Sequence, residues 1–244
     1  MSNYKLIIQY SGKNYCGWQI QNNAKSIQGE IKKNIETILG YEVNLIGSGR
    51  TDSGVHAIGQ VANFHAEIKN ESKFLYSLNS LLPQDISLVS IEKVSEEFNS
   101  RFDAVSRSYI YIISQLKSPF YVNYSYQLSW LNKIHVINLN QLSKNFIGKH
   151  DFTSFIKHQS EVENKICEIY NIHWRRVKDL TIFFIEGNRF LHGMVRAIVG
   201  SLLLAVKENY EDEYFQNLFA EKDRAKAGMS VPARGLFLYK VKYK

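Results

Sequence analysis

Apolar residues recur along the chain with two different periods, and these periods predict its secondary structure. Apolar side chains three or four residues apart lie on one face of a helix, whereas β-branched and aromatic runs are typical of strands. The first half therefore predicts helices over 26–39 and 72–82, the first closed by Gly40 and the second followed by Pro83. The strands that it predicts cover residues 5–10, 86–94 and 107–114.

The second half repeats this alternation more loosely. Residues 190–206 have a wide apolar face, which predicts a buried helix. The remaining predicted elements are helices over 139–147 and 212–220 and strands over 180–186 and 235–243. Helices and strands alternate without a long parallel-sheet pattern, which favours an α+β fold. We expect a boundary near 100–106, separating an N-terminal α+β domain (1–105) from a C-terminal one (106–244).

Composition narrows the class of protein without deciding it. The chain has 244 residues, 45% of them hydrophobic, which is enough for one large domain or two small ones. Its net charge of +7 suits a polyanionic partner, although many basic proteins bind no nucleic acid. No stretch approaches the roughly 18 apolar residues of a membrane span. The amino terminus lacks the apolar core of a signal peptide, so we expect no membrane association and a cytoplasmic location.

The two cysteines, Cys16 and Cys167, are too few for a metal cluster, and in the cytoplasm we expect them to be reduced thiols. The seven histidines show no metal-ligand spacing, so no metal site is expected.

The most unusual segment is residues 47–56, where glycines bracket a polar sequence and predict a tight loop. A phosphate-binding P-loop requires Gly-Lys-Ser/Thr at its end, but Gly54 is followed by Val55. A dinucleotide-binding loop requires a third glycine where this chain has Asp52, whose carboxylate would repel a pyrophosphate. The Gly-x-Ser-x-Gly pattern of a nucleophile elbow is also absent.

Residues 49–56, Gly-Arg-Thr-Asp-Ser-Gly-Val-His, instead resemble the signature Gly-Arg-Thr-Asp-Ala-Gly-Val-His of the tRNA pseudouridine synthase A family. The resemblance extends over nearly the whole chain, with further matching motifs in the expected order. These motifs are residues 10–12 with 17–19, the Arg-x-Tyr-x-Tyr sequence at 107–111, and residues 151–155, 190–200 and 235–238.

The resemblance implies a fold and an activity. The fold would be two similar ferredoxin-like halves, whose mixed or antiparallel sheets join into an extended sheet flanked by helices. The activity would be isomerisation of uridine to pseudouridine in the anticodon stem-loop of tRNA, at positions 38, 39 and 40, by a homodimer without cofactor or metal. Asp52 would be the nucleophile, attacking either the ribose or the base, or shielding positive charge on the sugar.

Arg196 is the second catalytic candidate, since the resemblance pairs it with the nucleophilic aspartate. A carboxylate in a pocket that excludes water keeps its charge when a cation lies beside it. His192, Arg196 and Gly200 are four residues apart, so we expect them to share one helix face, with Gly193 and Gly200 allowing another backbone to approach. A single arginine on an apolar helix is otherwise typically a partly exposed side chain.

Tyr109 and Arg50 complete the predicted site, while the nearby Tyr111 and His56 are expected to have structural roles. Alternation on a strand puts Tyr109 and Tyr111 on the same side, and the resemblance has Tyr109 stacking on the target base, while Tyr111 fits a core position. Arg50 would help to flip the target nucleotide out of its helix, or would serve as an electrostatic partner of Asp52. His56 follows closely, and a structural hydrogen bond is the expected use of its imidazole.

The chain departs from the family pattern in its presumed RNA contacts more than in its chemistry. Ser53 and Ser11 replace a usual alanine and a usual aspartate, and 229–230 lacks the common proline and threonine. Residues 159–166 also lack an arginine-rich character. Candidates for a basic RNA surface are Lys157, Arg175, Arg176, Lys178 and Arg189, although a solvated charge is the commoner role for any one of them.

Two other classes of protein compete with the enzyme. One is a catalytically silent RNA-binding protein on the same fold, which would have no use for Asp52, Tyr109 and Arg196 together. The other is a glycosidase, which generally needs two carboxylates, whereas no second acid accompanies Asp52.

Overall fold

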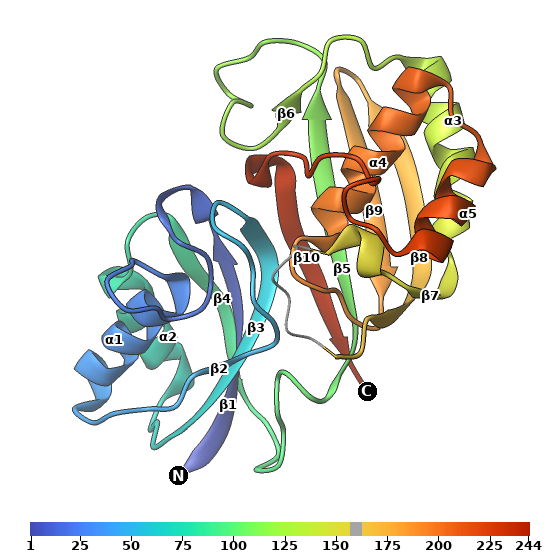
Figure 1. Cartoon of the computed structure of the whole chain (residues 1–244). Coiled ribbons are helices and arrows are strands. Elements are labelled where there is room, and N and C mark those ends of the chain that lie inside the picture. The colour runs from blue at the N-terminus through green and yellow to red at the C-terminus, as the bar shows by residue number, and fades with distance from the viewer. Residues whose placement is uncertain (157–162) are drawn as a thin grey trace. The chain divides into compact units, whose positions relative to one another are not determined.

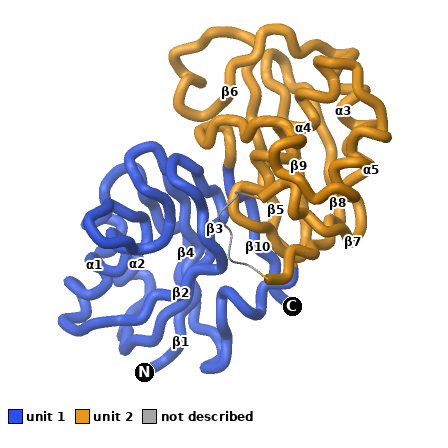
Figure 2. Tube along the Cα trace, in the orientation of Figure 1, with its two compact units in different colours: residues 1–105, 237–244 blue, residues 106–236 orange. Residues whose placement is uncertain are grey.

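The computed structural model describes residues 1–156 and 163–244, which form two compact units (Figure 2). The first unit contains residues 1–105 and 237–244, and the second contains residues 106–236. Each unit is a mixed sheet with helices packed against it (Figure 1). The fold is therefore α+β, as the sequence predicts. Lys157 and residues 159–162 of the segment 159–166 lie outside the described residues.

The first unit is built on the strand order β4-β1-β3-β10, with β2 paired to β3. Strand β1 is antiparallel to both β3 and β4, whereas β10 runs parallel to β3. The last strand in the sequence thus pairs next to the strand that follows the glycine-rich loop. The elements are β1 (Ser2–Tyr10), the 3-10 helix η1 (Gly12–Asn14), α1 (Ile27–Leu39), β2 (Ile46–Gly47), β3 (His56–Ala66), α2 (Glu71–Leu81), β4 (Ile86–Lys93) and β10 (Leu236–Tyr243).

Helix α1 shows why the sequence predicted these elements well. Its first turn is capped by Ser26, whose side chain accepts a hydrogen bond from the amide of Gly29. Ile27, Ile31 and Ile35 are spaced by one turn and are fully buried. The helix ends at Gly40, whose φ of 79° is the left-handed conformation that glycine adopts without strain. Local sequence alone therefore determines both ends of this helix.

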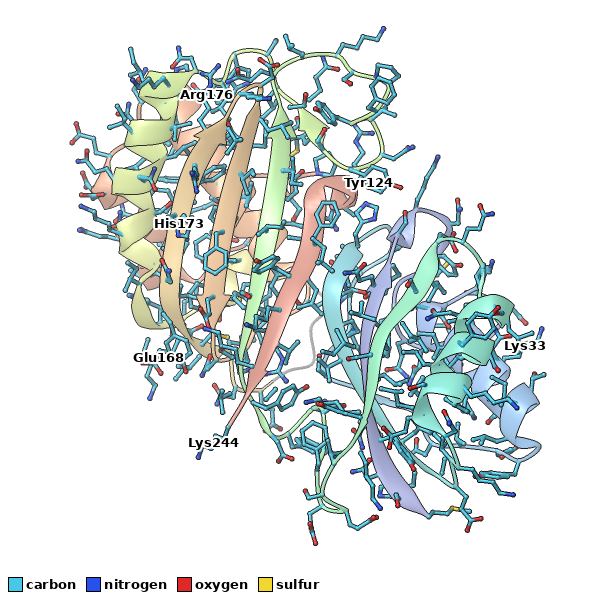
Figure 3. All side chains as sticks on the ribbon, turned by 180° about the vertical axis from the view of Figure 1, so that it is seen from behind. Lys33, Tyr124, Glu168, His173, Arg176 and Lys244 are labelled. Carbon is cyan, nitrogen blue, oxygen red and sulfur yellow. The ribbon has the colours of Figure 1, made fainter. Side chains whose placement is uncertain are left out.

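The second unit has the strand order β5-β9-β8-β7, in which neighbours are antiparallel, and β6 is parallel to β5. Helices α3, α4 and α5 lie against one face of this sheet (Figure 1). On the other face, seen from behind in Figure 3, His173 stacks on Phe184 with ring centroids 4.9 Å apart. The elements are β5 (Ala104–Ser114), β6 (Tyr126–Gln127), α3 (Lys133–Ser143), η2 (Lys144–Phe146), β7 (Gly148–Asp151), η3 (Thr153–Phe155), β8 (Ile166–Val177), β9 (Leu180–Gly187), α4 (Met194–Glu208), α5 (Asp212–Glu221) and η4 (Ala233–Gly235).

Helix α4 forms the centre of this unit, and most of its side chains are buried. A cluster of five phenylalanine rings lies beneath η2, η3 and α5, where the rings pack edge-on or tilted against one another. Its members are Phe146, Phe152, Phe155, Phe215 and Phe219. In the described part of the chain, no helix has both the length and the apolar character needed to cross a membrane.

Two long strands, β3 and β8, were not predicted. Strand β3 is buried on both faces and carries polar side chains inside, so its sequence lacks alternation. One of them, Asn63, donates to the side chain of Asn3 at 3.0 Å and accepts from the amide of Ser100 at 2.9 Å. In β8 a register shift between Ile169 and Asn171 reverses which residues face the core. Because of the buried polar side chains in β3 and the register shift in β8, neither sequence shows the two-residue alternation of apolar and polar positions by which a strand is predicted.

The predicted start of the helix over 139–147 was also wrong. Helix α3 begins at Lys133, because the Asn132 side chain caps the first turn and His135 completes a capping box. Ile134 and Ile137 remain exposed at 67% and 60%, so the apolar pattern of this helix does not mark its buried face.

Candidate active site

The predicted nucleophile, Asp52, lies in the loop that joins β2 to β3. Hydrogen bonds tie the start of this loop to β3: the Ser48 amide donates to the carbonyl of Val61 at 2.7 Å, and the side-chain amide of Gln60 donates to the carbonyl of Gly49 at 3.0 Å. Within the loop, the Val55 amide donates to the Asp52 carbonyl at 3.1 Å. The loop is thus an ordered turn held by hydrogen bonds to its main chain.

Residue 51, next to the nucleophile, is anchored from two sides. The hydroxyls of Thr51 and Tyr10 lie 2.8 Å apart in a buried hydrogen bond, and the Trp18 amide donates to the Thr51 carbonyl at 3.1 Å. Gly17 has a φ of 96°, and a methyl group there would overlap the Thr51 carbonyl oxygen. The Gly-Trp sequence near the amino terminus therefore has a structural reason: only glycine lets this segment pack so closely on the loop.

The imidazole of His56 has the structural role expected of it. Its Nδ1 accepts a hydrogen bond from the amide of Gly12 at 3.1 Å, and its ring stacks on Phe237 with centroids 4.7 Å apart. It is 1% exposed. A side chain at Gly12 would overlap the carbonyl oxygen of Val55. The end of the loop is therefore locked to η1 and to β10.

Against this fixed backbone, the side chains of Asp52 and its neighbours lie near the surface. Asp52 is half-buried, whereas Arg50 and Ser53 are exposed. The Nε of Arg50 donates to Gln19 Oε1 at 3.2 Å, and the Ser53 hydroxyl donates to the Tyr15 carbonyl at 3.2 Å. The serine that replaces the usual alanine is thus accommodated by a hydrogen bond. Both Asp52 and Arg50 are accessible for contact with a large substrate.

Tyr109 and Tyr111 lie on the same side of β5, as predicted. The ring of Tyr109 is 8% exposed and packs edge-on against Phe190, with centroids 5.1 Å apart. Tyr111 is fully buried, and its hydroxyl donates to the carbonyl of Pro232 at 2.9 Å. Burial raises the pKa of the Tyr111 phenol well above its ordinary value, so the hydroxyl stays a donor. The core position predicted for Tyr111 is confirmed.

Arg196 projects from the first turn of α4. Its Nε donates to the carbonyl of Val231 at 2.7 Å, and the Val231 amide donates back to the Arg196 carbonyl at 3.2 Å. The side chain is half-buried. No pattern in the sequence indicates this partner, because a backbone carbonyl carries no residue-type signal.

The predicted start of this helix was wrong, and so was one consequence drawn from it. Gly193 has a φ of 74° and acts as the N-cap, so α4 begins at Met194 rather than at residue 190. His192 therefore precedes the helix and does not share a helix face with Arg196 and Gly200. Gly200 does allow the close approach expected of it, since a methyl group there would overlap the carbonyl oxygen of Met229.

The structure assigns the predicted residues to different units. Asp52 and Arg50 belong to the first unit, and Tyr109 and Arg196 belong to the second. Inside each unit the supporting contacts are well defined. The pairing of Arg196 with Asp52 involves both units and stays a prediction.

Two further observations concern sites for a metal ion or a small-molecule cofactor. Over residues 1–156 and 163–244, no three His, Cys, Asp or Glu side chains gather as metal ligands would. A cavity of about 340 Å³ lies in the second unit, lined by Lys117, Tyr121 and Arg234 among others. It contains none of the predicted site residues, so it belongs to the loop after β5 rather than to this site.

Comparison with known proteins decides the family. The family model described as tRNA pseudouridine synthase matches residues 6–103 and 142–244. The chain belongs to this family. The family isomerises uridine to pseudouridine in tRNA, and the motifs at 49–56, 151–155, 190–200 and 235–238 all lie inside the matched residues.

Curated relatives of this tRNA pseudouridine synthase family member match over their full length. The tRNA pseudouridine synthase A of Brachyspira hyodysenteriae is 38% identical, covering 100% of this chain and 99% of that protein. Those of Francisella philomiragia and Clostridium acetobutylicum are 38% and 39% identical, covering 100% of this chain and 95% and 100% of theirs. A solved Cbf5-Nop10-Gar1 complex aligns with 82% of this chain and 53% of that chain at 13% identity, with a TM-score of 0.37.

Proposed function

We propose that this protein isomerises uridine to pseudouridine in tRNA with Asp52 as its nucleophile. Membership of the family supports the reaction. The observation that supports Asp52 is its place in the loop: its backbone is fixed by contacts to β1, β3 and η1, while its carboxylate is half-buried near the surface. A rigid backbone that presents one acid is what nucleophilic catalysis requires.

The reaction needs few groups, because the product is an isomer of the substrate. The bond between N1 of the base and C1′ of the ribose breaks, and a bond between C5 and C1′ forms. C5 then loses its proton and N1 gains one, so no atom is added and no electron is transferred overall. One carboxylate is sufficient to carry the ribose or the base between the two bonds, and the residues here are compatible with either route.

The other predicted residues take supporting roles in this proposal. Arg196 would hold Asp52 ionised and oriented through charge-assisted hydrogen bonds. Tyr109 would stack on the target base, which suits a ring that is fixed edge-on by Phe190. Arg50 is exposed, and its guanidinium would stack on bases or bind phosphate as the nucleotide is flipped out.

The finer features of the activity follow the family resemblance. We propose that the target uridines lie in the anticodon stem-loop at positions 38, 39 and 40, that the enzyme works as a homodimer, and that it acts in the cytoplasm. The net charge of +7 favours a polyanionic substrate.

Incubation of the purified protein with unmodified tRNA transcripts, followed by position-by-position mapping of pseudouridine, tests this proposal. We expect conversion confined to the anticodon stem-loop. Asp52→Asn, which keeps the shape of the side chain and removes its charge, should abolish conversion, whereas Glu42→Gln, an exposed acid of the same unit, should convert normally. Tight tRNA binding without conversion by the wild-type protein would identify a silent RNA-binding protein instead.

A further inference from the structure

Residues 228–232, which we call the bracing segment, lie along the first turns of α4 and contact it at three points. The Gly228 amide donates to the hydroxyl of Ser201 at 2.9 Å, and both groups are buried. The carbonyl of Met229 packs on the bare backbone of Gly200. The amide of Val231 donates to the carbonyl of Arg196 at 3.2 Å. These contacts hold the bracing segment alongside residues 196–201 of α4, over two turns of the helix.

The same segment binds the side chain of Arg196. Its Nε donates to the carbonyl of Val231 at 2.7 Å, a short hydrogen bond from a charged donor. This bond fixes the rotation of the guanidinium about its last side-chain torsions. Bidentate binding of a carboxylate by the end of the guanidinium uses Nη1 and Nη2. The Val231 carbonyl and a bound carboxylate would therefore accept hydrogen bonds from different nitrogens of the same planar guanidinium. The bond from Nε to the carbonyl would set the direction in which Nη1 and Nη2 point toward the carboxylate.

Further contacts hold the bracing segment at its two ends. The guanidinium of Arg224 donates to the carbonyls of Ala227 and Gly228 at 3.3 and 3.1 Å and to the Ser230 hydroxyl at 3.2 Å. At the other end, the buried hydroxyl of Tyr111 donates to the Pro232 carbonyl. A segment without regular secondary structure over 228–232 is thereby fixed by side chains from several elements.

We propose that the bracing segment is a positioning element that sets the orientation of the Arg196 guanidinium, with Gly200, Ser201 and Arg224 as its positioning residues. The proposal rests on the role given above to Arg196. It assigns a function to residues that act through Arg196. Misplacement of a catalytic group by about 1 Å costs up to a hundredfold in rate, so a brace of this kind affects turnover rather than substrate binding.

Gly200→Ala is the strongest test, because the added methyl group would overlap the Met229 carbonyl and displace the segment. We expect kcat for pseudouridine formation to fall about tenfold or more, with KM for tRNA within about twofold. Arg224→Gln, at a half-buried side chain, should preserve folding and lower kcat about threefold. Lys207→Gln is the matched control: it removes one exposed positive charge from the other end of α4 and should leave both constants unchanged.

A second measurement separates this inference from the proposed function. The Arg196 Nε–H resonance in a spectrum of arginine-labelled protein, assigned by its absence in Arg196→Met, should exchange slowly in the wild type and faster in Gly200→Ala and Arg224→Gln. Retention of the wild-type kcat by both folded variants, or a change confined to KM, would overturn the proposal. If Gly200→Ala does not fold, Arg224→Gln decides the question alone. A protected Nε–H together with normal turnover of Arg196→Met would refute the catalytic role of Arg196, not the brace.

Discussion

The loop that carries Asp52 and the helix that carries Arg196 present their side chains by different means. The loop is held by hydrogen bonds to its backbone and by glycines at the points of contact, so Asp52 is placed through main-chain contacts, several of them from residues 10–18. Helix α4 is held by apolar burial, which fixes the helix but not a polar side chain on it. The orientation of Arg196 comes from a carbonyl 35 residues further along the chain. The loop places its side chain by fixing the main chain, whereas a polar side chain on an apolar helix needs a partner for the side chain itself.

The largest expected effect is that of Asp52→Ala. Pseudouridine formation should fall by about a thousandfold or more, because the variant lacks the nucleophile, while tRNA binding stays within about tenfold of wild type. The fold should survive, since the hydrogen bonds that shape the loop use backbone atoms and the side chains of neighbouring residues. Single-turnover conversion and a binding assay measure the two quantities. A variant that converts uridine at the wild-type rate would remove Asp52 from the mechanism.

Arg196→Met should have the next largest effect. The change keeps an unbranched side chain for packing and removes the charge, so we expect kcat to fall about a hundredfold with little change in melting temperature. Steady-state kinetics and thermal unfolding of the same preparation give both values. An unchanged rate would show that the helix does not contribute to the site.

Two tyrosine hydroxyls allow a matched comparison of the two regions. Tyr10→Phe removes the buried bond to Thr51 in the loop region, and Tyr111→Phe removes the buried bond to Pro232 beside the bracing segment. Each should lower the free energy of unfolding by about 1 kcal/mol, as urea denaturation would show. If the brace matters more than the loop's redundant anchors, Tyr111→Phe lowers kcat and Tyr10→Phe does not. Equal kcat values in the two variants would contradict the distinction drawn here.

The same tyrosine predicts a pH dependence. Burial raises the pKa of Tyr111 in the folded protein, so the unfolded chain loses this proton first as the pH rises. The stability contributed by the protonated phenol should therefore decline above about pH 10, the ordinary tyrosine value. Tyr111→Phe should remove that part of the decline in denaturation curves measured between neutral and alkaline pH. An identical decline in the variant would assign it to other groups.

The smallest effect is expected at the ion pair of Lys222 with Asp151, which lies outside the Asp52 loop, α4 and the bracing segment. Burial raises the pKa of Asp151, but hydrogen bonds from Lys222 and Thr153 outweigh it, so the pKa lies below its ordinary value. The stability contributed by the ionised Asp151 carboxylate is present above its unfolded-state pKa and is lost as the pH falls through its folded-state pKa. Lys222→Gln should cost a few tenths of a kcal/mol at neutral pH, because the pair is partly exposed, and should not alter kcat. A large loss of turnover would mean that any disturbance of the second unit affects the site.

Prediction from the sequence succeeded where structure is local. Helix α1 has its cap, its apolar spacing and its glycine stop within 15 residues, and its predicted bounds agree with the structure. It failed where the apolar pattern does not decide: both faces of β3 are covered, and α4 starts late because Gly193 takes a left-handed conformation. The strand at the carboxyl end was predicted, but its place beside β3 was not.

Motifs in the sequence identify the family, the loop that carries Asp52 and the candidate groups, because they record residue types at fixed spacing. The contacts of Val231 with Arg196, and of Gly12 and Gly17 with the loop, emerge only in the folded chain. The physical reason is that these contacts involve backbone carbonyls and amides from distant segments. Every residue carries such groups, so no residue type marks the ones that are used.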